Sequence, residues 1–169
     1  MHVRLLRKTF YASLRQQRLL TIMTDALYEL VDRVAICELK ARYFRAVDTK
    51  DWDTFESLFA DDAVLSAPDD SPDLVFSSRS AVRAGVSSSL NGIATVHFGH
   101  MPQIGFDGPD EAHGVWAMED ELFFDDAPAS PIAYLHGYGH YHERYVRIDG
   151  TWKFRSVELR RLRVDTRPR

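Results

Sequence analysis

The first third of the chain has the hydrophobic spacing of a helix. Within residues 25–48, apolar side chains recur every three or four positions, which predicts an amphipathic helix. These apolar residues are Leu27, Leu30, Val31, Val34, Cys37, Ala41, Phe44 and Val47. Thr24 or Asp25 is placed to cap the start of this helix, and the polar run 48–50 ends the pattern.

Two shorter helices are expected next, each marked by its flanking residues. Asp51 can cap a helix whose apolar stripe is Trp52, Phe55, Leu58 and Phe59. A third helix fits residues 80–90, which end at the stop signal Asn91-Gly92. Between the two, residues 63–66 are a short strand candidate, and residues 67–78 carry the prolines and aspartates of a loop.

From residue 94 onward the hydrophobic period changes to two, which is the period of β-strands. The strands that this pattern predicts cover residues 94–106, 112–124, 132–148 and 152–164. Asp149-Gly150, between the last two, is a strong hairpin signal. Helices followed by an antiparallel meander predict an α+β fold, with the helices packed on one face of a strongly curved sheet.

Charge separates the N-terminal segment from the rest of the chain. Residues 1–22 contain five basic residues and no acidic one, whereas the remainder has 16 basic and 25 acidic residues. We therefore expect a basic extension over residues 1–23, helical or disordered, followed by one domain over residues 24–169. A transit peptide or a membrane-surface helix would also fit this segment. An upstream extension, frayed or loosely docked, is preferred because the segment contains no recognisable targeting signal or ligand site. A further alternative is that translation starts at Met23.

Composition excludes several classes of protein. The single cysteine, Cys37, rules out an intramolecular disulfide and a cysteine-rich zinc site. No run of apolar residues is long enough to span a membrane, and a net charge of −4 argues against a general nucleic-acid binder. We expect a cytoplasmic protein with neither a nucleic-acid partner nor a membrane span.

Strand parity places one acidic side chain on an otherwise apolar sheet face. The residues that alternate onto this face are Trp116, Met118, Asp120 and Leu122. Asp120 is therefore expected to be buried and to need a partner, and His97 on the preceding strand is the nearest imidazole. A rim-exposed Asp120 is the alternative. His100 lies three positions after His97, so only one of the two histidines faces inward on a regular strand, and the pattern leaves open which one.

Even positions of residues 135–142 are all histidine or tyrosine, and they include Tyr138 and His140. Successive even positions on a strand lie about 6–7 Å apart, too far for histidines of one strand to share a zinc ion. A mixed sheet face of aromatic and imidazole groups is therefore preferred, and no metal site is expected. Tyr43 and Asp48, on the first predicted helix, do not by themselves indicate a particular function.

Four stretches of sequence together resemble a SnoaL-like domain of the nuclear transport factor 2-like superfamily. They are AICELKARYFRAVDTKDWDTFESLFADDAV, TVHFGHMPQI, AHGVWAMEDEL and GHYHERYVRIDGTWKF. The similarity covers about residues 25–165 and is greatest to the branch that contains scytalone dehydratase, bile-acid 7α-dehydratase and polyketide cyclases. The resemblance implies a cone-shaped α+β fold, in which helices and a curved antiparallel sheet enclose a deep apolar pocket.

The resemblance also implies a site. The residues at the positions of the family's catalytic groups are Tyr43, Asp48, His97 and Asp120. Trp116 stands where scytalone dehydratase has a second catalytic histidine, which favours a single-histidine arrangement. The side chains expected to contact a substrate are Phe44, Trp52, Trp116, Met118, Tyr138, His140 and Arg160. Of these, Arg160, or its neighbour Arg161, would bind an anionic group.

The function implied is that of a cofactor-independent dehydratase, isomerase or cyclase. Its substrate would be a small, apolar, carbonyl-bearing molecule such as a polyketide, a steroid or a terpenoid. His97 would remove a proton, Asp120 would hold the His97 tautomer, and Tyr43, with Asp48 nearby, would donate a hydrogen bond to the substrate. The alternatives are a non-catalytic ligand-binding or accessory module and a subunit that only scaffolds an assembly.

Oligomers are common in this superfamily, so a homo-oligomer, a dimer or a trimer, is expected through the outer face of the sheet. Phe98 and His100, with Tyr141 or His142, are the residues expected on that face. Residues 84–143 contain no Lys or Arg, so a strongly anionic substrate is not expected.

Overall fold

A computed structural model describes residues 2–127 and 129–169, with side chains described from residue 16 onward. The chain divides into two compact parts, residues 1–36 and 37–169, and helix α1 (His2–Asp48) runs through the boundary. The second part also holds α2 (Trp52–Ser57) and α3 (Arg79–Ser89). Its strands are β1 (Phe59–Ser66), β2 (Val75–Ser77), β3 (Ala94–Gly99), β4 (Gln103–Phe106), β5 (Glu111–Phe123), β6 (Ile132–Ile148) and β7 (Thr151–Pro168).

The first part is helical throughout its described length. The helix begins at His2 rather than near Thr24. The Thr24 hydroxyl donates to the Leu20 carbonyl at 2.8 Å within the helix, so Thr24 does not cap a helix start. Apolar side chains of this part, such as Leu27 and Val34, are more than half exposed. None of the described helices is both long and apolar enough to cross a membrane.

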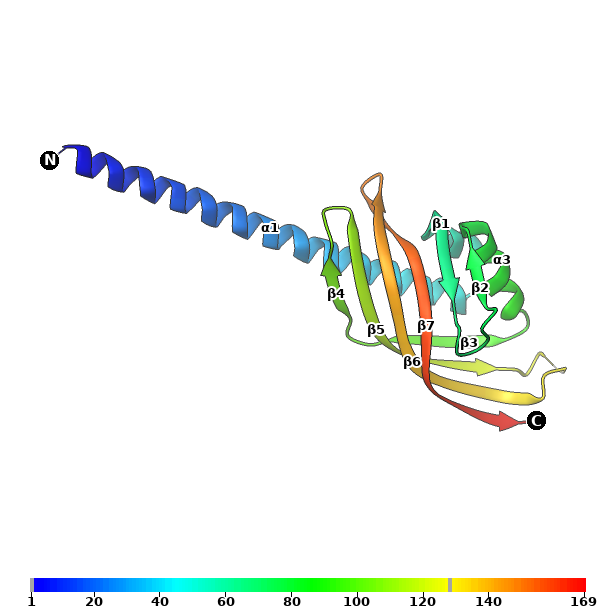
Figure 1. Ribbon diagram of the computed structural model, residues 1–169. Helices are drawn as coiled ribbons and strands as arrows, with labels where there is room; N and C mark the ends of the chain where they lie inside the picture. Colours follow the sequence, from blue (N-terminus) through cyan, green and yellow to red (C-terminus); the bar gives the residue numbers. More distant parts are fainter. Residues whose placement is uncertain (1, 128) are drawn as a thin grey trace. The chain divides into compact units, whose positions relative to one another are not determined.

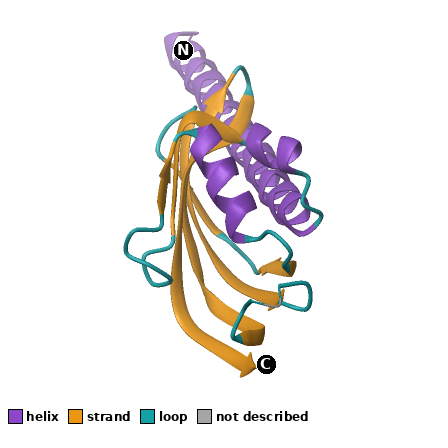
Figure 2. Cartoon of the chain, turned by 90° about the vertical axis from the view of Figure 1, so that its right-hand side faces the viewer, coloured by secondary structure: helices purple, strands orange, loops and turns teal. Residues whose placement is uncertain are grey.

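The second part is built on one curved sheet with strand order β2-β1-β7-β6-β5-β3. β4 also pairs with β5, along a different stretch of that strand from the one that pairs with β3. The long strands β5, β6 and β7 lie side by side, and the sheet bends strongly along them (Figure 1). β1 pairs in parallel with β7, so the sheet is mixed rather than wholly antiparallel as expected. Figure 2 shows α3 on the concave side of the sheet.

Side-chain and backbone caps fix the ends of the helices. Asp51 accepts a hydrogen bond from the Thr54 backbone N–H at 3.1 Å and begins α2, as its position in the sequence predicts. At the end of α1, the Lys50 N–H donates to the Val47 carbonyl and the Asp51 N–H to the Ala46 carbonyl. This pair of bonds is a Schellman motif. It places Lys50 in the left-handed region at φ 59°.

A buried polar network holds α1 against the sheet within the second part. Lys40 Nζ lies 2.5 Å from Glu143 Oε1, and both side chains are almost completely buried. The Tyr145 hydroxyl donates to Glu143 Oε2 at 2.5 Å and accepts from the Trp116 indole N–H at 2.8 Å. Lys40 Nζ also lies 3.5 Å from the centre of the Tyr141 ring. These contacts pair polar groups that would otherwise be costly to bury.

Candidate active site

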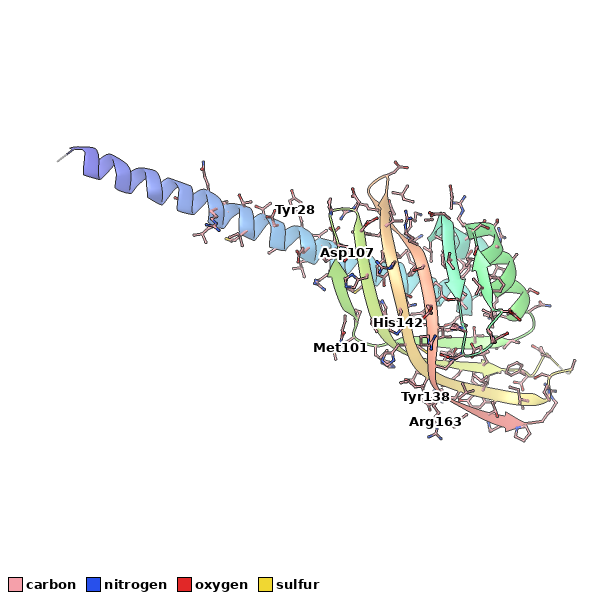
Figure 3. All side chains as sticks on the ribbon, in the orientation of Figure 1. Tyr28, Met101, Asp107, Tyr138, His142 and Arg163 are labelled. Atoms are coloured by element: carbon pink, nitrogen blue, oxygen red, sulfur yellow. The ribbon has the colours of Figure 1, made fainter. Side chains whose placement is uncertain are left out.

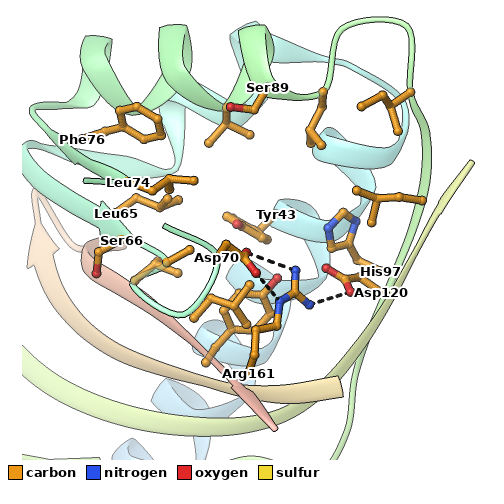
Figure 4. Close-up of a pocket in the computed structure, with 18 of the residues that line it drawn as sticks. Tyr43, Leu65, Ser66, Asp70, Leu74, Phe76, Ser89, His97, Asp120 and Arg161 are labelled. Atoms are coloured by element: carbon orange, nitrogen blue, oxygen red, sulfur yellow. Dashed lines mark hydrogen bonds and ion pairs between the residues drawn. The ribbon is translucent and has the colours of Figure 1, made fainter. Parts of the chain in front are cut away.

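A cavity of about 260 Å³ lies between the concave face of the sheet and the helices of the second part (Figure 4). Most of its wall is apolar. The lining residues are Tyr43, Leu65, Ser66, Ala67, Asp70, Leu74, Phe76, Val86, Ser89, Leu90, Ile93, His97, Asp120, Leu122, Phe124, Tyr141, Val157, Leu159 and Arg161. Figure 4 shows Leu65, Leu74 and Phe76 toward one end of the cavity and His97 and Asp120 toward the other.

His97 is held by Asp48 at the end of α1. Its ring Nδ1 lies 2.6 Å from Asp48 Oδ1, and its backbone N–H donates to Asp48 Oδ2 at 3.0 Å. The Nδ1 proton is therefore directed at the carboxylate. Ring atom Nε2 has no hydrogen-bond partner among the described side chains, and it belongs to a ring that lines the cavity.

Asp48 is arranged to remain ionised. Burial by itself would raise the pKa of this carboxyl. Its hydrogen bonds with the His97 ring and backbone, together with the one from Thr95, outweigh burial and lower the pKa below its usual value. The Thr95 hydroxyl donates to Asp48 Oδ1 at 2.9 Å. An ionised carboxylate at Nδ1 favours the tautomer that leaves the Nε2 lone pair available.

Asp120 is buried on the concave face, but its partner is Arg161 and not His97. Asp120 Oδ1 accepts from Arg161 Nη1 at 2.7 Å, and no hydrogen bond between Asp120 and His97 is found among the described side chains. Asp120 on β5 and His97 on β3 lie directly opposite each other in the strand register. The prediction that Asp120 orients His97 is nevertheless wrong, and Asp48 holds that position.

Gly137 explains how Asp120 reaches Arg161 across an intervening strand. It lies on β6, directly opposite Asp120 on β5. A Cβ atom at Gly137 would come within 2.2 Å of Arg161 Nη1 and 2.3 Å of Asp120 Oδ1. Because glycine leaves that space open, the guanidinium passes over β6 to the carboxylate.

Arg161 also ties the segment between β1 and β2 to the cavity wall. Its Nε donates to Asp70 Oδ1 at 3.1 Å and its backbone N–H to Asp69 Oδ2 at 2.9 Å. Burial alone would lower the pKa of Arg161, but the hydrogen bond and charge of Asp120 raise it above its usual value. Arg160, predicted to contact a ligand, is instead half-exposed and paired with Asp69, because it faces the other side of β7.

Tyr43 and Tyr141 contribute aromatic wall to the cavity. Both residues are buried, 5% and 3% exposed respectively. Burial raises the pKa of Tyr43, and the charge of Glu143 raises it further. The Tyr43 phenol therefore remains protonated and can donate a hydrogen bond. Tyr141, expected on the outer face, points inward.

None of the seven residues predicted to contact a ligand belongs to the wall of this cavity, and four of them lie elsewhere on or beside the concave face. Phe44 stacks on the His97 ring, with ring centres 6.1 Å apart and an interplanar angle of 15°, and so supports the histidine. Trp116 and Met118 are buried elsewhere on the concave face, and Trp116 is occupied by its hydrogen bond to Tyr145. Trp52 borders a neighbouring open hollow that Asp48 also lines.

The outer, convex face of the sheet carries the remaining predicted residues. Alternate residues of β6 are buried at Gly137, Gly139 and Tyr141, so Tyr138 and His140 face the other side, and the prediction that they contact the ligand is corrected. Tyr138 lies beside Arg163 of β7 on that face (Figure 3). His100 is on the same face, where its Nε2 lies 3.1 Å from Glu119, so His97 is the inward histidine.

Sequence reasoning did not single out Asp70, and it put Arg160 ahead of Arg161. Strand parity from the apolar Val157 and Leu159 leads to Arg161 as the next inward position. Asp70 has no such signal, because it lies in a loop. Among the residues whose side chains are described, no three His, Cys, Asp or Glu side chains are grouped so that they could hold a metal ion.

A curved sheet with helices over its concave side defines an α+β cone, and its cavity holds a histidine bound to a carboxylate. The family model described as SnoaL-like domain matches residues 28–158, and the chain belongs to this family. This confirms the resemblance found in the sequence.

Individual proteins are similar to the chain at lower identity. The probable cyclase FGR4 of Gibberella zeae is 26% identical over 133 residues, which are 73% of this chain and 86% of that protein. A candidate scytalone dehydratase from Novosphingobium aromaticivorans superposes with a TM-score of 0.73 at 22% identity, over 83% of this chain and 95% of that one. A type 2 hexachlorocyclohexane dehydrochlorinase (LinA) superposes with a TM-score of 0.72 at 19% identity, over 83% of this chain and 91% of that one. These likenesses confirm the cone-shaped α+β fold.

Proposed function

We propose that the protein is an acid–base enzyme of the lyase or isomerase type, which removes a proton from carbon in a small, mostly apolar substrate. The observation that carries the proposal is the His97 ring, which is bound to Asp48 through Nδ1 and lines the cavity with Nε2 unpartnered among the described side chains. A histidine held by a carboxylate in this way is a common form of general base.

The relatives support a reaction that begins with removal of a proton. They are named as a cyclase, a scytalone dehydratase and a dehydrochlorinase. Loss of water or of hydrogen chloride both require a base that takes a proton from carbon while a leaving group departs. The Asp48–His97 pair would supply that base with the chain's own side chains.

Each group in the cavity has a role in such a step. His97 Nε2 takes the proton, and Asp48 stabilises the imidazolium that forms. The electron pair of the broken C–H bond becomes a double bond as the leaving group departs, or an enolate where the substrate is isomerised. Tyr43 donates a hydrogen bond to the carbonyl or to the departing hydroxyl. That hydroxyl takes the proton from the His97 imidazolium and leaves as water. A positioned base of this kind contributes about 10²–10⁴-fold.

The wall of the cavity favours a neutral substrate of modest size. Asp70 and Asp120 both pair with the single guanidinium of Arg161, so an anionic ligand would meet two carboxylates and an arginine whose charge is already balanced. The volume of about 260 Å³ lies below the range of about 300–1,000 Å³ typical of pockets for drug-sized ligands. Small carbonyl compounds of the polyketide or terpenoid type fit better than large ones.

Hydrogen exchange in D₂O tests the proposal with a panel of simple model ketones. Neutral cyclic and aromatic ketones are incubated with the protein, and NMR follows deuterium uptake next to the carbonyl and any elimination product. We expect wild-type protein to catalyse one of these changes and His97→Gln to lose about 10²–10⁴-fold of the rate. His100→Gln is the matched control, because His100 lies on the convex face, and it should retain the rate.

Two outcomes contradict the proposal. Equal rates for wild type and His97→Gln would remove His97 as the base. Ketones that bind in the cavity, as shown by chemical shift changes at its lining residues, but never exchange or react would identify a binding module instead.

A further inference from the structure

The hydrogen bonds at Asp48 continue past the His97 pair to a lysine outside the cavity wall. Lys50 Nζ lies 2.9 Å from Thr95 Oγ1, and Thr95 Oγ1 lies 2.9 Å from Asp48 Oδ1. Thr95 is buried, and it stands two positions before His97 on β3, so the two side chains share one face of the strand. Neither Lys50 nor Thr95 lines the cavity.

The direction of this chain of hydrogen bonds is fixed by its chemistry. An ammonium group has three donors and no acceptor. Thr95 Oγ1 must therefore accept from Lys50, and its single proton is left to point at Asp48. One carboxylate oxygen of Asp48 is then held by Thr95 and the His97 ring, and the other by the His97 backbone N–H. The carboxylate cannot rotate without breaking one of these bonds.

The backbone at Lys50 is unfavourable for a lysine. Lys50 occupies the position after the end of α1 that adopts a left-handed conformation, at φ 59°, where glycine is the usual residue. A residue that keeps a side chain at such a position does so against a local conformational cost, and such positions gather at functional sites. The side chain it keeps is the one that reaches Thr95.

We propose that Lys50 and Thr95 are positioning residues for the Asp48–His97 pair, which they act on through the Asp48 carboxylate. The inference rests on the proposed function, because it assigns these residues a part in the same reaction. Thr95 fixes the orientation of the carboxylate, and Lys50 fixes the orientation of the Thr95 hydroxyl. Lys50 also places a positive charge next to the pair, separated from Asp48 by the Thr95 hydroxyl alone.

That charge acts together with the other ionisable groups around His97. They are Tyr43 and Asp48 on α1, Asp120 on β5 and Arg161 on β7, and Asp126 shares a hollow with Lys50. Of these, Arg161 is neutralised by Asp120 and Asp70. The Lys50 ammonium therefore adds a positive charge that acts on the Asp48 carboxylate, which it reaches through the Thr95 hydroxyl.

Substitutions of Thr95 test the orientation of Asp48 by a signal that needs no turnover. The Nδ1–H of His97, buried and bonded to a carboxylate, gives a downfield proton resonance that His97→Gln identifies by its loss. We expect Thr95→Val, which has the same shape without a hydroxyl, to shift this resonance upfield or broaden it. Thr95→Ser restores a hydroxyl and should keep it. An unchanged resonance in a folded Thr95→Val protein would overturn the proposal.

Lys50→Gly separates positioning from a merely structural role. Glycine relieves the left-handed backbone, so we expect a midpoint of thermal unfolding equal to or above that of wild type. The Nδ1–H resonance should weaken, and kcat should fall about 10-fold with KM unchanged. Lower stability with an unchanged resonance would show that Lys50 only supports the fold. If wild type has no turnover, the proposed function fails, and the resonance still decides this inference.

Discussion

Two ion pairs join the end of α1 to the sheet, and they differ in what surrounds them. Lys40 and Glu143 have side chains that are 1% and 0% exposed, in a core filled by aromatic rings. Asp48 and His97 are 23% and 8% exposed beside a cavity. Burial lowers the pKa of Lys40 to about 8 despite the opposing charge of Glu143. At Asp48 the hydrogen bonds outweigh burial, so the pKa of this carboxyl is lowered.

The difference shows which charged pair is suited to chemistry. Both oxygens of Glu143 are occupied, one by Lys40 and the other by Tyr145, so proton transfer at that pair would break the core network. The Asp48–His97 pair has hydrogen bonds on one side of the imidazole and a cavity on the other. We therefore assign the first pair to stability, whereas the second has the surroundings that the proposed function requires.

Removal of Lys40 should give the largest loss of stability. Lys40→Met leaves the Glu143 carboxylate buried without its cation, and we expect the free energy of unfolding to fall by about 3–5 kcal/mol. Urea unfolding measures the change. The double variant Lys40→Met with Glu143→Leu removes both charges and should recover most of the loss. A fall below about 1 kcal/mol in the single variant would contradict the assignment of this pair to stability.

The third pair, Asp120 with Arg161, should respond to a change in the residue between its members. Gly137→Ala puts a methyl group where the guanidinium and the carboxylate meet. We expect a loss of about 1–3 kcal/mol of stability, as for other overpacked sites. Gly108→Ala is the matched control, because a Cβ there meets no atom within 4 Å among the described residues. Equal effects of the two substitutions would show that Gly137 is not needed for the pair.

The smallest expected effect is the acid dependence of stability that comes from Asp48. Its pKa is lowered in the folded protein, so the unfolded chain binds the proton first as the pH falls. Asp48 therefore contributes stability above about pH 5, and the contribution is lost as the pH falls through the folded pKa. The difference in unfolding free energy between wild type and Asp48→Asn should narrow from about pH 5 to about pH 3.

Asp25→Asn is the control for this measurement, because Asp25 is exposed on α1. Its difference from wild type should stay constant over the same range. If the difference in unfolding free energy between wild type and Asp48→Asn widened toward low pH, the pKa of Asp48 would be raised in the folded protein rather than lowered.

Local patterns in the sequence predicted most elements of the second part, and they failed where partners come from distant strands. The cap at Asp51 and the inward side of Asp120 follow from neighbouring residues alone. The partner of Asp120 depends instead on strand register and on Gly137 in the strand between. The pairing of Asp48 with His97 joins residues 49 positions apart. A buried Lys40 interrupts the apolar pattern of its helix and has no signal of its own.

The segment between β1 and β2 is attached to β7 through Arg161 and its neighbour Arg160, which pairs with Asp69. Arg161 holds Asp69 with its backbone and Asp70 with its guanidinium, and the segment contributes Asp70 and Leu74 to the cavity wall. The Asp48–His97 pair is built from α1 and β3 alone. Under the proposed function, part of the wall that selects the ligand and the pair that moves the proton thus belong to separate stretches of chain, so evolution or a designer could exchange the segment to accept new molecules while Asp48 and His97 stay as they are.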